Sequence, residues 1–481
     1  MLLVALMGEY QCEYSFSINS ASYTLVINQQ NLEGFQFLEH RADNSLAVAN
    51  YPYNSRIIVL DSELRQQINL YVPFHSVSNI FTTSKEAILC INPLDKTLWQ
   101  FSFSQYGWRN TGVQFTWLGT WSIDEKNGTI LSAEYCDDTS PYARVIRSTD
   151  DGLTWSTVFV KQAYGSTSPE IRHFHTVTVD PYTGYWYLSS GDRPPECMVW
   201  ISKDDGTTWT DVTDYDFDPT TEPKVRTQAL FRLTTMWFTP QYICWATDDR
   251  INGTGAKLVI SPRTEPLDIH VLGTVSYNHV RSSIEFPGIG WLLITEDNTG
   301  LSYIETTFVT NDFHIIPCGK LQDITGYFSS SIASKRAYWD NQKNCYIGYS
   351  LARGLVPRIV RYELYRDYQL NIRIEEETGG RVNIEPTSNN HYRKGEKVKI
   401  TAVEEPGYIF TGWSGDYVSS SKTIQLVIEK DTNLTAHFYP RDIEPEFEVS
   451  LTSRVSLVIL IIFISITAIL SFIRVNRISL P

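Results

Sequence analysis

An all-β fold is predicted by three features of the 481-residue sequence. Short runs of β-branched and aromatic residues recur along the chain and are separated by Gly, Pro, Asn and Asp, which is typical of strands joined by tight turns. Aromatic residues are abundant at 13%, including 13 Trp, and suit large rings packed between sheets. An eight-residue pattern also occurs twice, at a spacing that fits one repeating unit of several strands.

The repeated pattern is Ser-x-Asp-x-Gly-x-Thr-Trp. It is found at residues 148–155 and again at 202–209, so that Asp150 and Asp204 lie 54 positions apart. Each copy lies between two strand-like runs, and Ser and Asp side chains there are expected to accept hydrogen bonds from backbone amides and fix a turn. The glycine supplies a positive φ, and the tryptophan opens the next strand. A repeat of this period indicates a propeller or a solenoid.

This pattern resembles the Asp-box, or BNR repeat, of sialidase-like β-propellers. In that family the box is a folding device on the outer turns of the blades. The resemblance therefore implies a structural role, and no catalytic one, for the four marker residues of each copy. These are Ser148, Asp150, Gly152 and Trp155 in the first copy and Ser202, Asp204, Gly206 and Trp209 in the second.

A β-propeller is accordingly predicted over residues 20–366. Seven units of blade size follow one another: 35–70, 76–108, 115–160, 172–212, 226–272, 276–317 and 327–365. Seven four-stranded blades are expected. Six and eight remain alternatives because only two units carry the repeated pattern. Residues 1–19 precede the propeller as an N-terminal segment, either a weak signal peptide without Lys or Arg or a first strand.

A second module is predicted at residues 368–438. Its markers are Gly379-Gly380, Tyr392-Arg393-Lys394-Gly395, and the run from Pro406 to Asp416 that contains Gly412-Trp413-Ser414-Gly415. Alternation of polar and apolar residues at 397–402 and 423–428 indicates half-buried strands. The order of these markers resembles the bacterial repeat module related to internalin B-repeats. That resemblance implies a small β module of surface proteins that acts as a spacer or binding unit.

The end of the sequence predicts a membrane anchor. Residues 439–453 form an acidic, proline-containing stalk, and residues 455–473 are 19 uncharged residues rich in Ile and Leu. That length spans a bilayer as one transmembrane helix, and residues 474–481 form a short tail. Lys and Arg are balanced across the helix. A single-pass protein with an extracellular propeller is favoured because both modules resemble surface modules; a tail anchor with a cytoplasmic propeller is the alternative.

Composition excludes several classes of function. The net charge is −14 and no basic stripe occurs, which argues against nucleic-acid binding. The seven cysteines are scattered without a C-x-x-C pair, so that buried thiols are expected and one or two disulfides remain open. The acidic run Asp214-Tyr-Asp216-Phe-Asp218 lacks the glycine and glutamate of a calcium loop. No metal site and no cofactor are predicted.

Candidate ligand-binding residues come from the expected starts of the blades. His173 and His175 alternate, so both point to one side of a strand. Arginines and histidines there suggest a positive pocket for a carboxylated sugar, because Arg grips carboxylate with two hydrogen bonds. The alternative is an ordinary wet channel lined by polar residues. The candidates are Arg41, Arg172, His173, His175, Arg226, His279, Arg281 and Tyr327.

These features together predict a membrane-anchored surface propeller that binds a glycan or a protein partner without catalysis. The alternative is a membrane-anchored glycan-processing enzyme, either a sialidase-like glycosidase or a polysaccharide lyase. The early Arg-Ile-Pro motif of sialidases is not matched, since Arg56-Ile57-Ile58 lacks the proline. No catalytic residue is therefore assigned. An enzyme predicts three convergent arginines or a His–Tyr–Arg set, whereas a binding protein predicts a face lined by aromatics.

Overall fold

The computed structural model describes most of the chain between residues 10 and 441 and divides it into two compact units. The first unit holds the residues up to Asp367 together with Arg393–Gly395, and the second holds the remainder from Tyr368 onward. The described ranges are 10–18, 20–33, 35–41, 45–50, 55–117, 119–192, 195–214, 227–248, 255–296, 303–322, 329–333, 335–353, 358–388 and 390–441.

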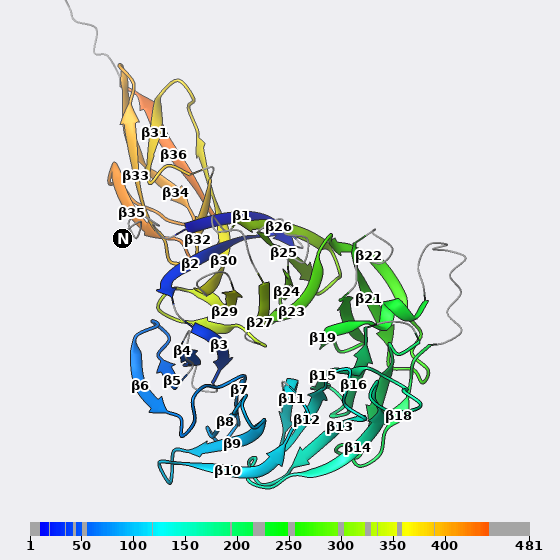
Figure 1. Cartoon of the computed structure of the whole chain (residues 1–481). Coiled ribbons are helices and arrows are strands. Elements are labelled where there is room, and N and C mark those ends of the chain that lie inside the picture. Colours follow the sequence, from blue (N-terminus) through cyan, green and yellow to red (C-terminus); the bar gives the residue numbers. More distant parts are fainter. Residues whose placement is uncertain are drawn as a thin grey trace, which may run out of the picture. The chain divides into compact units, whose positions relative to one another are not determined.

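The first unit contains six antiparallel four-stranded sheets, each formed by four strands that are consecutive in the chain. Figure 1 shows the sheets arranged around a ring, with the first strand of each towards its centre. The first three sheets are β3 (Phe35–His40), β4 (Leu46–Asn50), β5 (Arg56–Leu60) and β6 (Gln66–Tyr71); β7 (Ile80–Thr82), β8 (Ile88–Ile91), β9 (Thr97–Ser102) and β10 (Gly107–Gln114); and β11 (Gly119–Lys126), β12 (Thr129–Tyr135), β13 (Tyr142–Ser148) and β14 (Ser156–Gln162).

The next three sheets repeat this plan, and the short 3-10 helix η2 (Thr227–Phe231) precedes the second of them. They are β15 (His173–Val179), β16 (Trp186–Gly191), β17 (Val199–Ser202) and β18 (Thr210–Asp211); β19 (Leu233–Phe238), β20 (Tyr242–Thr247), β21 (Ala256–Pro262) and β22 (His270–Ser276); and β23 (His279–Phe286), β24 (Gly290–Glu296), β25 (Tyr303–Thr310) and β26 (Ile315–Gln322).

A further sheet closes the ring by joining both ends of the unit. In it, β29 pairs with β27 and β30, and β30 pairs with β2 from the start of the chain, placing Leu25 opposite Leu364. The Thr24 hydroxyl also donates to Asp367 Oδ2 at 2.6 Å. Pairing between strands from the two ends of the unit leaves fewer unpaired strand edges, which could otherwise pair with another chain. Its strands are β1 (Tyr10–Ile18), β2 (Ala21–Glu33), β27 (Ser329–Ala333), β28 (Tyr338–Asp340), β29 (Cys345–Arg353) and β30 (Arg358–Ile374).

The core of the first unit lies between neighbouring sheets. All six residues of β16 and all four of β8 are buried. Each sheet packs between its two neighbours in the ring and is therefore covered on both faces. Trp186 of β16 packs with Leu131 of β12 and Val145 of β13 from the preceding sheet. The predicted all-β propeller is therefore confirmed, and each predicted unit from 35–70 to 276–317 overlaps one four-stranded sheet.

The repeated eight-residue pattern forms two turns with the same hydrogen bonds. In the turn between β13 and β14, the Gly152 amide donates to Ser148 Oγ at 2.9 Å, and the Thr154 amide donates to Asp150 Oδ1 at 2.8 Å. The Trp155 indole donates to the Gly152 carbonyl at 2.9 Å. The turn between β17 and β18 repeats these contacts within 0.1 Å through Ser202, Asp204, Gly206, Thr208 and Trp209.

Both turns also pack against the preceding sheet in the same way. Gly152 and Gly206 have φ of +80°, and a Cβ added to them would lie 2.7 Å from a Leu89 methyl and 2.9 Å from a Leu131 methyl, respectively. The residue before each glycine accepts a bond from the third strand of that sheet: Asp151 O from Gln100 at 2.6 Å and Asp205 O from Arg147 at 3.2 Å. The turns therefore connect neighbouring sheets as well as neighbouring strands.

The second unit is a small β module with one apolar core. A three-stranded sheet is formed by β31 (Gly380–Glu385), β33 (Lys397–Glu404) and β35 (Thr423–Val427), while β34 (Tyr408–Gly415) and residues 370–374 of β30 flank β36 (Thr432–Pro440). The short strand β32 spans His391–Arg393. Alternate residues of β33 and β35 are buried, including Val398, Ile400 and Leu426, as the alternating sequence indicates.

The membrane prediction concerns residues that the structure does not describe. The predicted helix at 455–473 and most of the stalk, from residue 442 onward, lie outside the described ranges. Within those ranges, no helix is both long and apolar enough to cross a bilayer. All seven cysteines do lie in the described part, and none forms a disulfide. The expected buried thiols are therefore found: six of the seven cysteines are buried, and Cys12 is half-buried.

Candidate ligand-binding site

One end of the ring carries a group of charged and aromatic side chains. In each sheet, the first strand starts where the antiparallel second strand ends, so residues at these positions in neighbouring sheets meet on the same end of the ring. We call the group that meets there the inner-strand cluster. It comprises Tyr135 at the end of β12, Arg172 before β15, His173 and His175 of β15, Asp192 after β16, Arg232 before β19, Asp248 after β20, and His279 and Arg281 of β23.

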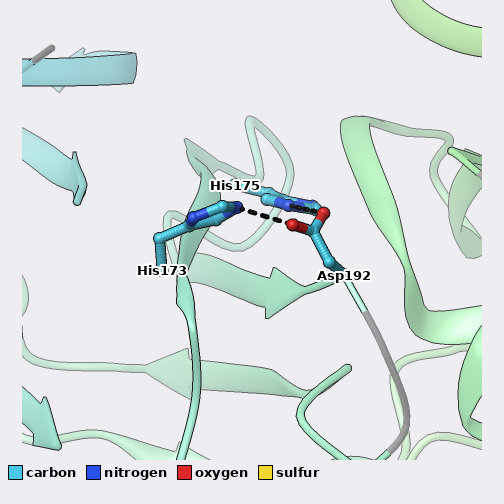
Figure 2. A group of neighbouring side chains, drawn as sticks. All are labelled: His173, His175 and Asp192. Atoms are coloured by element: carbon cyan, nitrogen blue, oxygen red, sulfur yellow. Dashed lines mark ion pairs between the residues drawn. The ribbon is translucent and has the colours of Figure 1, made fainter. Parts of the chain in front are cut away.

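Two histidines face one carboxylate in this cluster, as Figure 2 shows. His173 Nε2 lies 3.4 Å from Asp192 Oδ2, and His175 Nε2 lies 3.3 Å from Asp192 Oδ1. Both imidazoles are only 1% exposed. The alternation of the two histidines along β15 places both rings on one side, with centroids 5.1 Å apart. The two rings thus lie on the same side of β15, as the alternation predicts.

The other nitrogen of each ring is held by the backbone. His173 Nδ1 lies 3.3 Å from the Cys136 carbonyl oxygen, and His175 Nδ1 lies 3.1 Å from the Leu233 carbonyl oxygen. A carbonyl only accepts hydrogen bonds, so each Nδ1 must carry the proton. Burial lowers the pKa of His173, which favours its neutral form. In that form Nε2 of His173 presents a lone pair towards Asp192.

Arg172 pairs with two carboxylates at the edge of the cluster. Its guanidinium contacts Asp192 Oδ2 and also donates to Asp138 Oδ1 at 2.6 Å. Burial opposes the charged form of Arg172, but its hydrogen bonds to Asp138 and Asp192 raise the pKa of this arginine above its ordinary value. Arg172 is one third exposed, so it forms the solvent-facing border of the group.

A second carboxylate, Asp248, is fully buried and lies among three basic groups. Arg281 NH1 is 2.7 Å from Oδ1, His279 Nδ1 is 3.4 Å from Oδ1, and Arg232 Nε is 3.4 Å from Oδ2. Burial would raise the pKa of Asp248, but Arg281, His279 and Arg232 hold it below its usual range. Arg232 also reaches Asp192 with NH2 at 3.5 Å. It therefore links the two acidic centres of the cluster.

The charges of this end of the ring are balanced within the protein. Three guanidinium groups, of Arg172, Arg232 and Arg281, face the carboxylates of Asp138, Asp192 and Asp248. A bidentate clamp on a ligand carboxylate needs guanidinium groups that do not already face one. The predicted positive pocket for a carboxylated sugar is therefore not favoured by the arginines that the structure brings together.

The sequence did not single out two aromatic residues at this end of the ring, Tyr135 in the cluster and Trp117 beside it. The Tyr135 ring stacks on Trp117 with centroids 5.5 Å apart, and its centroid also lies 3.8 Å from that of His173 and 6.5 Å from that of His175. Both Tyr135 and Trp117 are half-buried. Burial raises the pKa of Tyr135 to about 12, so that its hydroxyl stays protonated at neutral pH. Tyr135, Asp192 and Asp248 all lie at the end of a second strand or directly after it, a position that no sequence motif marks.

Three predicted ligand residues do not join this cluster. Arg41 follows β3 instead of opening it and lies in the turn to β4, at the opposite end of the inner strand. It is buried, with its guanidinium carbon 4.9 Å from the Phe103 ring centroid and NH2 3.5 Å from Glu86. Its placement at a blade start was wrong because the strand begins earlier, at Phe35. Arg226 and Tyr327 lie outside the described residues.

Comparison with known structures reports similarity at the level of the fold. A streptogramin B lyase structure has a TM-score of 0.47 and 12% identity, covering 74% of this chain and 98% of that one. Virginiamycin B lyase from Staphylococcus aureus has a TM-score of 0.47 and 9% identity, with coverages of 71% and 99%. PorZ, a surface component of the type-IX secretion system of Porphyromonas gingivalis, has a TM-score of 0.41 and 9% identity; the coverages are 68% and 38%.

Sequence comparison identifies the second unit. Comparison with curated proteins finds no match to the chain. Residues 370–442 match the family model of the divergent InlB B-repeat domain. This match confirms the predicted repeat module, which the sequence markers placed at 368–438. The chain thus carries an InlB-like B-repeat domain in addition to its β-propeller.

Proposed function

We propose that this protein is a membrane-anchored surface protein whose propeller binds a glycan at the end of the ring that carries the inner-strand cluster. The observation that supports this function best is the stacked pair of Trp117 and Tyr135 beside the buried polar groups. Half-buried aromatic rings can pack against the apolar faces of sugar rings, and neighbouring polar groups can bond to sugar hydroxyls.

The internal charge balance also favours binding of a neutral ligand over binding of an acidic one. The three arginines of the cluster already face protein carboxylates, so a carboxylated sugar would have to compete with Asp138, Asp192 and Asp248. A neutral glycan needs no such exchange. We therefore infer that the ligand is a glycan without a required carboxylate, and a protein partner is the alternative.

A glycan-processing enzyme is the second candidate, since Tyr135, His173 and Arg172 do converge. Such a His–Tyr–Arg set is what a polysaccharide lyase requires. However, a general base must present its nitrogen to the substrate. Both nitrogens of His173 face protein atoms, the Cys136 carbonyl and Asp192, and the side chain is 1% exposed. This arrangement supports a binding role more than a catalytic one.

The glycan test uses the full chain in detergent on an array of neutral and acidic glycans. The wild type is expected to bind neutral glycans, and Trp117→Ala is expected to lose that binding because one ring of the stacked pair is removed. Trp339→Ala is the matched control, since Trp339 is 37% exposed on β28, away from the cluster. An array without any bound glycan would overturn the glycan proposal and leave a protein partner as the ligand.

The enzyme candidate has its own test. Fluorogenic sialosides and uronate polymers are incubated with the full chain, and release of fluorophore or of unsaturated sugar is measured. We expect no turnover above that of a heat-inactivated sample. Turnover that disappears in the His173→Gln variant would establish the enzyme instead.

Membrane anchoring is proposed from residues 455–473, 19 residues without a charge. The InlB-like B-repeat domain before this segment supports display on the outside of the cell. Fractionation is expected to find the full chain in the membrane and a chain truncated after residue 441 in the soluble fraction. Protease added to intact cells is expected to degrade the propeller. A propeller that survives in intact cells but not in lysed ones would place it inside.

The number of blades is inferred to be seven. Six four-stranded sheets are described, and the sheet that combines β27, β29, β30 and β2 supplies one more. A ring of seven sheets agrees with the contacts of β3 with β7, of β11 with β15 and of β15 with β19, and with those of β27 and β29 with β3 that complete the circle. An experimental structure showing an additional or a missing sheet would correct this number.

A further inference from the structure

We propose that His173, His175 and Asp192 bind one divalent first-row transition-metal ion. Their ligand atoms all lie within 4.8 Å of one another. The three side chains come from one sheet, with the histidines on β15 and the aspartate directly after its neighbour β16. The proposal goes beyond the glycan-binding function and does not depend on it.

The first argument is the direction of the lone pairs. The backbone carbonyls of Cys136 and Leu233 fix the proton of each imidazole on Nδ1. In the neutral tautomer that these contacts select, both Nε2 atoms turn lone pairs towards the carboxylate of Asp192, which itself only accepts. His173 Nε2 is buried and makes no hydrogen bond. Electron-pair donors that converge in this way repel each other unless a cation lies between them.

The backbone contacts have a second meaning. Histidines that bind metal ions generally donate their other ring N–H to a carbonyl or carboxylate, which fixes the tautomer and the orientation of the ring. His173 and His175 both show this arrangement with main-chain carbonyls. Because the partners are backbone atoms of Cys136 and Leu233, the orientation is built into the fold.

The two nitrogen–oxygen separations fit a small four-coordinate ion, and the two Nε2 atoms lie within 4.8 Å of each other. Bonds of about 2.0–2.1 Å at tetrahedral angles put neighbouring ligand atoms about 3.3 Å apart. The observed N–O distances are 3.4 Å for His173 and 3.3 Å for His175. Each imidazole faces a different oxygen of Asp192, so a small rotation of the carboxylate, or its use of both oxygens, completes the set.

Nearby arginines oppose a cation, and their own partners reduce that effect. Arg172 and Arg232 both reach Asp192, but Arg172 also pairs with Asp138 and Arg232 with Asp248. The guanidinium groups therefore neutralise the negative charge of Asp192 only in part. Hydrogen bonds to the outer lone pairs of a metal-binding carboxylate are common and hold it in place.

The ligand set limits the ion and its chemistry. Imidazole nitrogens suit zinc, iron, cobalt and nickel, whereas calcium and magnesium prefer oxygen ligands. Three protein ligands leave the fourth position for a water molecule or for an oxygen of a bound ligand. Asp192 is the most exposed of the three, at 14% of its side chain, so that position opens on its side.

The test is titration of the chelator-treated full chain with Co²⁺, whose visible absorption reports tetrahedral coordination. The wild type is expected to take up about one ion per chain, and Zn²⁺ is expected to displace it. Asp192→Asn and His173→Gln are expected to abolish the absorption. His314→Gln is the control, because His314 is 74% exposed beside Asp312 and does not belong to the cluster.

A second measurement needs no variant. X-ray absorption of the zinc-loaded wild type is expected to show two imidazoles and at least one oxygen at about 2.0–2.1 Å. Absence of stoichiometric uptake by the wild type would overturn the proposal. So would uptake that is equal in the folded Asp192→Asn variant, since the ion would then be bound elsewhere. If the wild type takes up no ion, a proton or a water molecule between His173, His175 and Asp192 accounts for their distances instead.

Discussion

The paired turns and the inner-strand cluster both contain buried polar side chains, but the partners of these side chains come from different places. In the first turn, Asp150 accepts bonds from Ser148 and Thr154, all within seven residues. In the cluster, Asp192 and Asp248 face residues from three sheets of the ring. The Ser and Asp side chains of the repeated pattern are bonded within their own turns, whereas the cluster leaves His173 Nε2 and both Asp248 oxygens without a hydrogen bond of good geometry.

This difference separates a folding device from a site. Ser and Asp side chains that are bonded within their own turn are not available to a ligand. A buried group of charges whose atoms are ion-paired but incompletely hydrogen-bonded is costly to keep, and such groups gather where a protein binds or reacts. We therefore place the function at the inner-strand cluster and the structural role at the turns.

The largest effect is expected from Asp248→Asn, which removes the carboxylate between Arg281, Arg232 and His279. Loss of one partner leaves buried charge without compensation and costs about 3–5 kcal/mol of the free energy of unfolding. Urea denaturation measures it. Asp268→Asn is the control: this carboxylate is 66% exposed beside His270, and a change within about 0.5 kcal/mol is expected.

Substitution of the turn glycines is expected to have the next largest effect. Gly152→Ala and Gly206→Ala each force a Cβ into the left-handed region, at about 1–2 kcal/mol, and into a leucine methyl, at about 1 kcal/mol more. Gly288→Ala is the control for strain alone, since its φ is +76° and nothing lies within 4 Å of the added carbon. If all three variants lose equal stability in thermal unfolding, the contact with the preceding sheet contributes nothing.

Removal of the turn carboxylates is expected to cost less. Asp150→Ala loses the bonds to the Thr154 amide at 2.8 Å and hydroxyl at 2.6 Å, worth about 1–2 kcal/mol together after exchange with water. Asp204→Ala loses the equivalent bonds from Thr208 but is more exposed, so its cost is smaller. Denaturation midpoints give the order, and a larger loss at Asp204 would contradict the role assigned to burial.

The smallest expected effect is a dependence on acid. Burial opposes ionisation of Asp150, but hydrogen bonds from Thr154 and Ser148 outweigh it and lower the pKa of this carboxyl. Its contribution to stability is then fully present above the unfolded value of about 3.9 and is lost as the pH falls through the lower folded value. The difference in unfolding free energy between wild type and Asp150→Asn should be constant near neutral pH and shrink below about pH 4. A constant difference down to pH 2 would contradict it.

Most of the fold prediction rested on short sequence patterns. The Ser-x-Asp-x-Gly-x-Thr-Trp turns are formed by contacts within eight residues, so the sequence alone indicates them and their 54-residue spacing. The alternation of Lys397–Glu404 likewise predicts the half-buried strand β33. Closure by β2 and β30 could not be predicted, because their pairing joins residues more than 300 positions apart.

The site was predicted only where it lies at strand starts. His173, His175, His279 and Arg281 were found because they open β15 and β23. Asp192 and Asp248 were missed because each follows a second strand, a position that has no sequence signature of its own. The expectation of no metal site came from the lack of a familiar spacing. The ligand set proposed here joins a His-x-His pair to an aspartate from the next strand, which only the fold brings near.

The account's central claim is that the inner-strand cluster, unlike the turns, is a site for a ligand, and locating the ion tests it most directly. Crystals of the zinc-treated protein would be measured on both sides of the zinc absorption edge. We predict one anomalous peak bonded to His173 Nε2, His175 Nε2 and Asp192, which is absent in Asp192→Asn and unchanged in Asp204→Asn. A map with no peak between these three residues in the zinc-saturated wild type would contradict the account.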